Sequence, residues 1–78
     1  MSEVEAKVDT IGQACPVPVL LTRRGLKKIK SGQILEVFGD FFPAKKNIQD
    51  YAEKHGHEVI EVIEPDDNGI YKIFIKKG

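Results

Sequence analysis

Apolar and polar residues alternate at the start of the chain. Between Glu3 and Asp9, the residues Val4, Ala6 and Val8 are separated by charged side chains. This period of two predicts a half-buried strand. Turn signals bound three further predicted strands, at Ile34–Phe38, His57–Glu64 and Ile70–Lys76.

The last two strands are joined by Pro65–Gly69, whose Asn-Gly pair is typical of a β-hairpin.

Two other segments have the spacing of amphipathic helices. The first runs from Pro16 to Lys30, with prolines in the first turn, where a missing N–H costs little. We expect Ser31-Gly32 to end it, with glycine as the C-cap. The second begins at Pro43, after the loop Asp40–Phe42, and ends at Gly56. Their predicted apolar faces are Val19, Leu21, Thr22, Leu26 and Ile29 in the first, and Ala44, Ile48, Tyr51, Ala52 and His55 in the second.

The predicted order is therefore β-α-β-α-β-β, in a single domain over residues 1–78. The first strand-helix-strand unit should be a right-handed parallel crossover. Since each helix has one apolar face, both should cover the same face of a four-stranded mixed sheet. The predicted fold class is a two-layer α/β sandwich.

Composition narrows the function classes. Twelve basic and twelve acidic residues balance, so net charge predicts no partner, and one cysteine excludes an intramolecular disulfide. No apolar stretch approaches the ~20 residues that span a bilayer, and the first residues lack the apolar core of a signal peptide. We expect a cytoplasmic protein that does not act at a membrane.

Cys15 is the candidate reactive residue, because it directly precedes the first predicted helix. Free N–H groups and the positive end of the helix dipole favour a thiolate, which lowers a cysteine pKa. Position alone also allows a plain buried cysteine. Pro16 stiffens the helix start, Pro18 removes another backbone donor there, and Gly12 permits a tight turn. This combination favours a fixed, exposed thiol.

A cysteine enzyme of the ordinary kind needs a base beside the thiol. The two histidines, His55 and His57, lie far along the chain at the end of the second helix. A packed or capping role suits His55 better than a catalytic one. One cysteine and two histidines also show no ligand spacing typical of zinc, so we expect no metal site.

The segment from Asp9 to Pro18 resembles the signature of the TusA family, also called SirA-like or YedF-like proteins. Their Asp-x-x-Gly-x-x-Cys-Pro-x-Pro motif is present in full, and length, element order and the final Lys-Gly also match. The resemblance implies a sulfur carrier of the sulfurtransferase type. Cys15 would receive sulfane sulfur as a persulfide from a cysteine desulfurase or rhodanese and pass it to an acceptor protein. The motif residues are Asp9, Gly12, Cys15, Pro16 and Pro18.

Within this resemblance, Asp9 would hold the junction between strand and loop, while Gly12 and the prolines would shape the loop. No bound cofactor is expected, because the sulfur is carried by the protein itself. The chain departs from the family where many members have acidic residues that lead into the second helix. Phe41 and Phe42 stand there instead, and Asn47 replaces the usual aspartate.

The first predicted helix is cationic. It has no acid, and Leu20 lies on its charged side with Val17 beside it. The charge is typical of a solvated face, or of a docking surface for an acidic protein or RNA. Leu20 would either contact the Phe41-Phe42 loop or form part of a partner site. The candidate partner-binding residues are Val17, Leu20, Arg23, Arg24 and Lys27, with Lys28 and Lys30 adding charge.

A second function class stays open from these residues: a regulatory module that binds RNA or protein without covalent chemistry. No aromatic strand motif of the RRM type is present. RNA binding that survives Cys15→Ser and weakens steeply with salt would favour this class.

Overall fold

The computed structural model describes residues 4–14 and 16–78. Within them the element order confirms the prediction, and strand and helix boundaries agree with it to about two residues. The elements are β1 (Val4–Asp9), α1 (Val17–Lys28), β2 (Ile34–Gly39), α2 (Phe42–Lys54), β3 (Glu58–Ile63) and β4 (Tyr71–Lys76).

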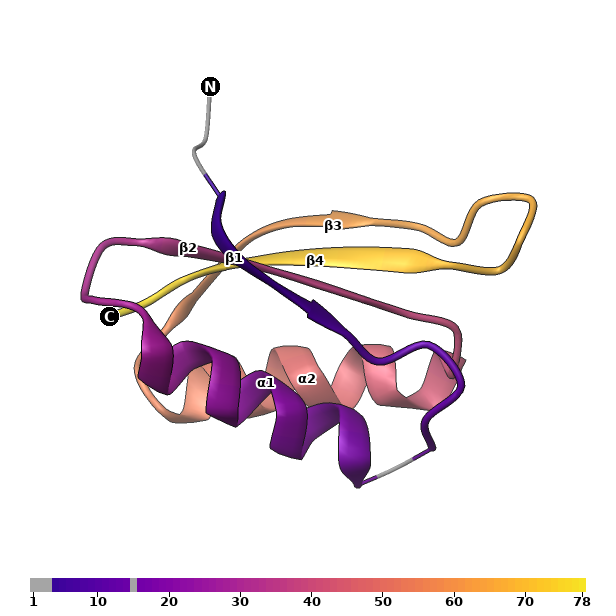
Figure 1. Cartoon of the computed structure of the whole chain (residues 1–78), viewed down its shortest axis with the longest axis horizontal. Coiled ribbons are helices and arrows are strands. Elements are labelled where there is room, and N and C mark those ends of the chain that lie inside the picture. The colour runs from indigo at the N-terminus through magenta and orange to yellow at the C-terminus, as the bar shows by residue number, and fades with distance from the viewer. Residues whose placement is uncertain (1–3, 15) are drawn as a thin grey trace.

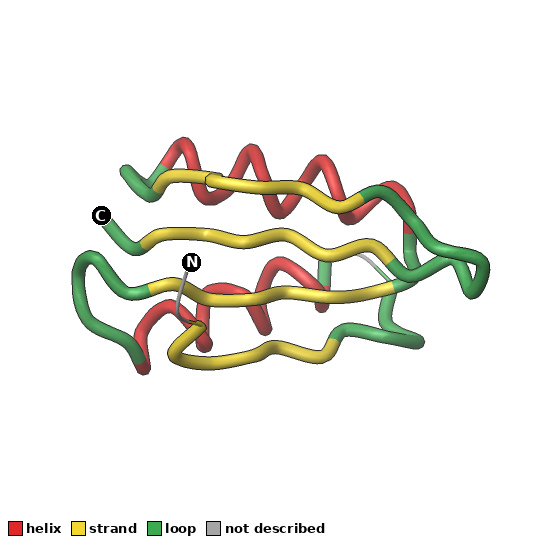
Figure 2. Tube along the Cα trace, turned by 90° about the horizontal axis from the view of Figure 1, so that it is seen from above, coloured by secondary structure: helices red, strands yellow, loops and turns green. Residues whose placement is uncertain are grey.

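The four strands form one mixed sheet in the order β1-β2-β4-β3 (Figure 2). β1 pairs with β2 in parallel, and β4 pairs with both β2 and β3 in antiparallel orientation. Both helices lie against the same face of the sheet, and none of the described helices or strands covers its other face (Figure 1). The two-layer α/β sandwich with a four-stranded mixed sheet is therefore confirmed.

The core lies between the sheet and the helices. In β2, Leu35 and Val37 are fully buried, and in β4 the same holds for Tyr71, Ile73 and Ile75. In β4 these residues alternate with more exposed ones, as expected for a sheet with one covered face, whereas in β2 the intervening Glu36 is itself buried. The helices contribute Leu26, Ala44, Ile48 and Ala52 to the same cluster.

The buried stripe of α1 differs from the predicted face. Its buried members are Pro18, Thr22, Gly25 and Leu26, while Val19 and Leu21 are only half-buried. Thr22 can lie in the core because its hydroxyl donates to the Pro18 carbonyl at 2.8 Å. The helix is thus rotated toward its smaller residues, which lets it approach the sheet closely.

The end of α1 was also predicted wrongly. The helix ends at Lys28, two residues early, and Ile29 has the extended dihedrals φ −112° and ψ 165°. The Lys30 N–H then donates to the Gln33 side chain at 2.7 Å. Gly32, at φ +88°, belongs to the following turn and is not a helix cap.

The end of α2 follows the prediction. Gly56 has φ +82°, and its N–H donates to the Glu53 carbonyl at 3.2 Å. The His57 N–H reaches back to the Ala52 carbonyl at 2.8 Å. These two bonds form a Schellman motif, which requires the left-handed conformation that glycine adopts without strain.

The β3–β4 hairpin depends on Asp66 as well as on the Asn-Gly pair. The Asp66 carboxylate accepts the backbone N–H groups of Asn68 at 2.9 Å and Ile70 at 3.1 Å. These hydrogen bonds, the one from Ile70 first, lower the pKa of Asp66. The side chain therefore organises the turn in its ionised form.

Gly25 is the residue whose change should disturb this packing most simply. A methyl group there would lie 2.6 Å from Val8 Cγ2 and 3.1 Å from Leu35 Cδ1. We expect Gly25→Ala to lower the free energy of unfolding by about 1–3 kcal/mol, as overpacking of a core does. Urea denaturation measures this change.

Lys27→Ala, on the exposed side of the same helix, is the control, and it should stay within about 0.5 kcal/mol of wild type. Alanine normally stabilises a helix interior relative to glycine by ~1 kcal/mol. A gain of stability in Gly25→Ala would therefore contradict the close approach of α1 to β1.

Candidate functional site

Two loops meet at one end of the sheet. β1 and β2 are parallel, so their C-terminal ends lie at the same edge. The loop over residues 10–16 leads from β1 into α1, and the short link over residues 40–41 leads from β2 into α2. This end is on the right in Figure 1. The predicted motif therefore lies where two helices begin.

Thr10 fastens the first loop to the sheet. Its backbone N–H donates to the Phe38 carbonyl at 2.8 Å and its hydroxyl to the same oxygen at 2.9 Å. Thr10 is fully buried. A side chain at Gly39 would strike the Thr10 hydroxyl and the Tyr71 ring. Sequence reasoning treated Thr10 only as part of a loop; a small polar residue directly after a strand was the available signal.

Asp9 and Asp40 hold the turn of this loop. The Asp9 carboxylate accepts the Ile11 N–H at 2.9 Å, which fixes the junction between strand and loop. Gly12 follows with φ +82°, a conformation that side chains rarely adopt. The Gly12 N–H then donates to the Asp40 carboxylate at 2.9 Å, across 28 residues of sequence. Asp40, which sequence reasoning missed, thus joins the two loops.

Cys15 itself lies outside the described residues, whereas the residues before and after it in the chain are described. Ahead of it, the Ala14 carbonyl accepts the Val17 N–H at 3.0 Å. Behind it, Pro16 is the N-cap of α1, and its carbonyl accepts the Leu20 N–H at 3.2 Å. Pro18 is fully buried. The chain is therefore fixed on both sides of the candidate reactive residue.

The candidate partner-binding residues lie on the outer side of α1. Leu20 is 49% exposed, Val17 is half-buried, and Arg23, Arg24 and Lys27 are exposed. Since Leu20 stands one helical turn from both Arg24 and Pro16, an apolar side chain lies among cations close to the loop.

The two phenylalanines at the start of α2 differ in their surroundings. Phe41 packs against the hydrophobic core, while Phe42 is 61% exposed at the first residue of α2. The helix thus begins one residue before the predicted Pro43. Phe42 lies against the ammonium of Lys45, whose nitrogen is 5.3 Å from the ring centre and also pairs with Glu64.

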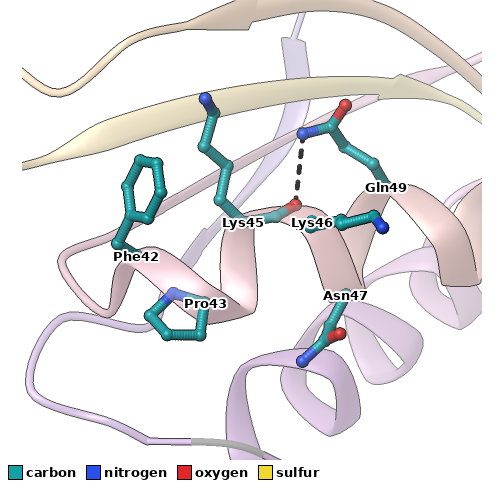
Figure 3. A pocket seen from close by; sticks show the side chains of 6 residues that line it. All are labelled: Phe42, Pro43, Lys45, Lys46, Asn47 and Gln49. Carbon is teal, nitrogen blue, oxygen red and sulfur yellow. Dashed lines mark hydrogen bonds between the residues drawn. The ribbon is translucent and has the colours of Figure 1, made fainter.

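A shallow depression of about 540 Å³ follows the first two turns of α2 (Figure 3). It is open to solvent and lies on the outer side of the helix, where Gln49 donates to the Lys45 carbonyl at 3.2 Å. Its lining residues are Phe42, Pro43, Lys45, Lys46, Asn47 and Gln49. Two of the three residues that depart from the family pattern, Phe42 and Asn47, therefore line this depression, while Phe41 does not.

The C-terminal end of α2 lies at the opposite end of the molecule (Figure 1), and both histidines directly follow it in the chain. α2 has 13 residues and is about 20 Å long. His55 is the C-cap of α2 and stacks on Tyr51 with ring centres 4.3 Å apart, which confirms the predicted capping role, although its side chain is exposed rather than buried. His57 accepts the Gly78 N–H at 3.1 Å, and burial, then Lys77 and His55, lower its pKa. Neither histidine can serve as a base at the loops.

Within residues 4–14 and 16–78, no three of His, Cys, Asp and Glu gather closely enough to hold a metal ion. None of the helices found in that part of the chain is long and apolar enough to cross a membrane.

Comparisons with known proteins agree on one family. The profile described as Sulfurtransferase TusA matches residues 6–77. A candidate sulfur carrier protein of Methanocaldococcus jannaschii is 42% identical over 71 residues, 91% of this chain and 92% of that protein. One of Thermotoga maritima is 40% identical, over 95% and 92% of the two chains. The crystal structure of a SirA-like protein from Desulfitobacterium hafniense superimposes with a TM-score of 0.81 at 28% identity, over 94% and 97%.

The Gly12–Asp40 hydrogen bond should rigidify the loop that bears the motif. We expect Asp40→Ala to lower the free energy of unfolding by about 0.5–1.5 kcal/mol and to speed hydrogen exchange at the Gly12 amide. NMR exchange and urea denaturation measure the two effects. Asp50→Ala, at an exposed position of α2, is the control. Unchanged exchange at Gly12 in Asp40→Ala would show that the bond does not restrain the loop.

Proposed function

The chain belongs to the TusA sulfurtransferase family, and on this premise we propose that it is a sulfur-relay protein that carries sulfane sulfur as a persulfide on Cys15. The observation that carries the proposal is the fixed geometry on both sides of Cys15. The Gly12–Asp40 bond holds the loop ahead of it, and buried Pro18 holds the helix behind it.

The proposed chemistry needs no base and no redox partner. The Cys15 thiolate attacks the outer sulfur of a donor persulfide, R–S–SH. A new S–S bond forms on Cys15, the old one breaks, and the donor leaves as the thiolate R–S⁻. An acceptor thiolate then attacks the outer sulfur of Cys15–S–SH and regenerates the Cys15 thiolate. Each step exchanges one S–S bond for another, so atoms and electrons balance.

The position before α1 suits both steps. In each of them Cys15 is a thiolate, once as nucleophile and once as leaving group. Backbone N–H groups and the helix dipole at an N-terminus stabilise that anion. Because both histidines lie about one helix length away, this stabilisation would come from the helix and not from an imidazolium.

A sulfur carrier acts by docking to its donor and acceptor proteins, so it depends on contact surfaces more than on a substrate pocket. We propose that a cysteine desulfurase or a rhodanese supplies the sulfur and that a downstream protein takes it. The outer side of α1 around Leu20 would form part of the docking surface, since an apolar residue among cations suits a transient protein contact. Relay chemistry requires reduced thiols, so the cytoplasm stays the predicted compartment.

One test of the proposed function concerns the carrier chemistry itself. After incubation with a cysteine desulfurase and cysteine, wild type should gain the mass of one sulfur atom, and dithiothreitol should remove it. Cys15→Ser should gain nothing. Intact-mass spectrometry measures both proteins side by side.

No gain of sulfur on wild type, from this donor or from thiosulfate with a rhodanese, would contradict the relay. The cationic outer side of α1 would then favour the second function class, a binding module without covalent chemistry. RNA binding by Cys15→Ser that falls steeply with salt would support that class.

A further prediction concerns the docking of the donor protein on α1. Leu20→Glu should slow sulfur transfer from the donor enzyme by about fivefold or more, the loss expected when a contact of ~1 kcal/mol is removed. Ile63→Glu is the matched control, since Ile63 on β3 is 41% exposed and far from α1 in the sheet order. Single-turnover transfer measures both variants. Equal rates in the two would exclude Leu20 from the docking surface.

A further inference from the structure

A second hollow lies between β1 and α1. It has a volume of about 310 Å³ and is separate from the depression on α2. Its apolar floor includes Ala6, Val8 and Leu21, and Gly25 also lines it. Lys7, Asp9, Arg24 and Lys28 complete the lining. We call these eight residues the β1–α1 groove.

The groove follows an open edge of the sheet. β1 is the first strand in the sheet order and among the described residues pairs with β2 alone. The Thr10 N–H points to β2, where it meets the Phe38 carbonyl. Because successive residues of a strand direct their backbone groups to opposite sides, those of Lys7 and Asp9 point away from β2. They face the position that a fifth strand would occupy.

The regular part of this edge is next to the loop of Cys15. The register is shifted between Val4 and Ala6 and is continuous from Ala6 to Asp9. α1 runs back over β1 from its first turn, so the Asp9 end of the groove adjoins the motif loop. A strand seated here would end beside residues 10–14.

The charge of the groove selects its occupant. Lys7, Arg24 and Lys28 contribute three cations, and the one carboxylate, of Asp9, already accepts the Ile11 N–H. The added strand would direct alternate side chains to the helix layer, near Leu21 and Arg24, and to the open face, near Lys7. On the helix side, Arg24 and Lys28 would attract an acidic strand and repel a basic one. On the open face, Lys7 stands between the carboxylates of Glu5 and Asp9, so selectivity comes from the helix side.

We propose that the β1–α1 groove binds an extended acidic segment of a partner protein, which adds to the edge of β1 as a fifth strand. The partner is a donor or acceptor of the relay, so its identity rests on the proposed function. Backbone hydrogen bonds at Lys7 and Asp9 supply affinity, and the cations supply selectivity. The segment is thereby positioned so that the reactive group next to it reaches Cys15.

The test uses the ¹⁵N-labelled full chain with Cys15→Ser, so that binding is scored without sulfur chemistry. The probe is a short peptide in which Glu alternates with Val, and the control peptide has Lys in place of Glu. The acidic peptide should shift the Lys7 and Asp9 amides and slow their hydrogen exchange, while the Lys peptide leaves them unchanged. If Cys15 carries no sulfur but the acidic peptide still shifts these amides, the groove proposal holds independently of the proposed function.

Arg24→Glu and Arg23→Glu are the matched variants, because they change the same charge on neighbouring, exposed residues of α1. Only Arg24 lines the groove. Arg24→Glu should weaken the acidic peptide about fivefold or more, and Arg23→Glu should stay within about twofold. Equal losses of peptide affinity in both variants would overturn the proposal and indicate a general cationic surface instead.

Three other results would also overturn the proposal. The first is an absence of shifts at Lys7 and Asp9 with saturating acidic peptide. The second is equal shifts along β3, the other edge of the sheet. The third is the same shifts on concentrating the protein alone, which would assign the edge to a second copy of this chain, since β3 itself is an acidic strand.

Discussion

The parallel pairing of β1 with β2 is the constraint on which the rest of the structure depends. Parallel neighbours need a crossover connection, and α1 provides it. The crossover packs closely because Gly25 has no side chain to hold it away from Val8 and Leu35. Since both strands end at one edge, their loops meet there, and the Gly12 N–H can reach Asp40. The placement of the motif is therefore a consequence of topology.

The order and type of the elements could be predicted because they depend on local patterns: alternation in β1, a glycine after α2, and turn residues between β3 and β4. The end of α1 could not. The Ile29 carbonyl accepts the Lys77 ammonium at 2.7 Å, and the Lys77 backbone pairs with Gly32 and Gln33. These contacts join segments more than 40 residues apart, and they override the helical tendency of Ile29 and Lys30. Similarly, the need for glycine at position 25 comes from Val8 and Leu35 of the sheet. A helical wheel of α1 alone does not show these neighbours.

The residues of the candidate site also divide into those with partners nearby in sequence and those with distant partners. Asp9 and Gly12 act on their own loop, so the motif alone indicated where the chain turns. Thr10 bonds to Phe38 at the end of β2, and Asp40 bonds to Gly12 in the other loop, each across 28 residues of sequence. No spacing in the sequence indicates either pair. Pro18 was predicted to remove a backbone donor at the helix start, and it is also a buried anchor of that start. Residues whose partners are distant in sequence were the ones that sequence reasoning missed.

The balanced net charge conceals a difference between the two edges of the sheet. β3 has Glu58 and Glu61 and no cation, whereas the hollow beside β1 has three cations and one carboxylate. Open edges are where another strand can pair, and the sign of charge decides which strand approaches each edge. An acidic strand is repelled by β3 and attracted to β1, beside the loop that bears Cys15. A basic strand is directed to the opposite edge, away from that loop. A protein with no net charge can thus discriminate between partners by where its charges lie, and the favoured edge is the one nearest its candidate reactive residue.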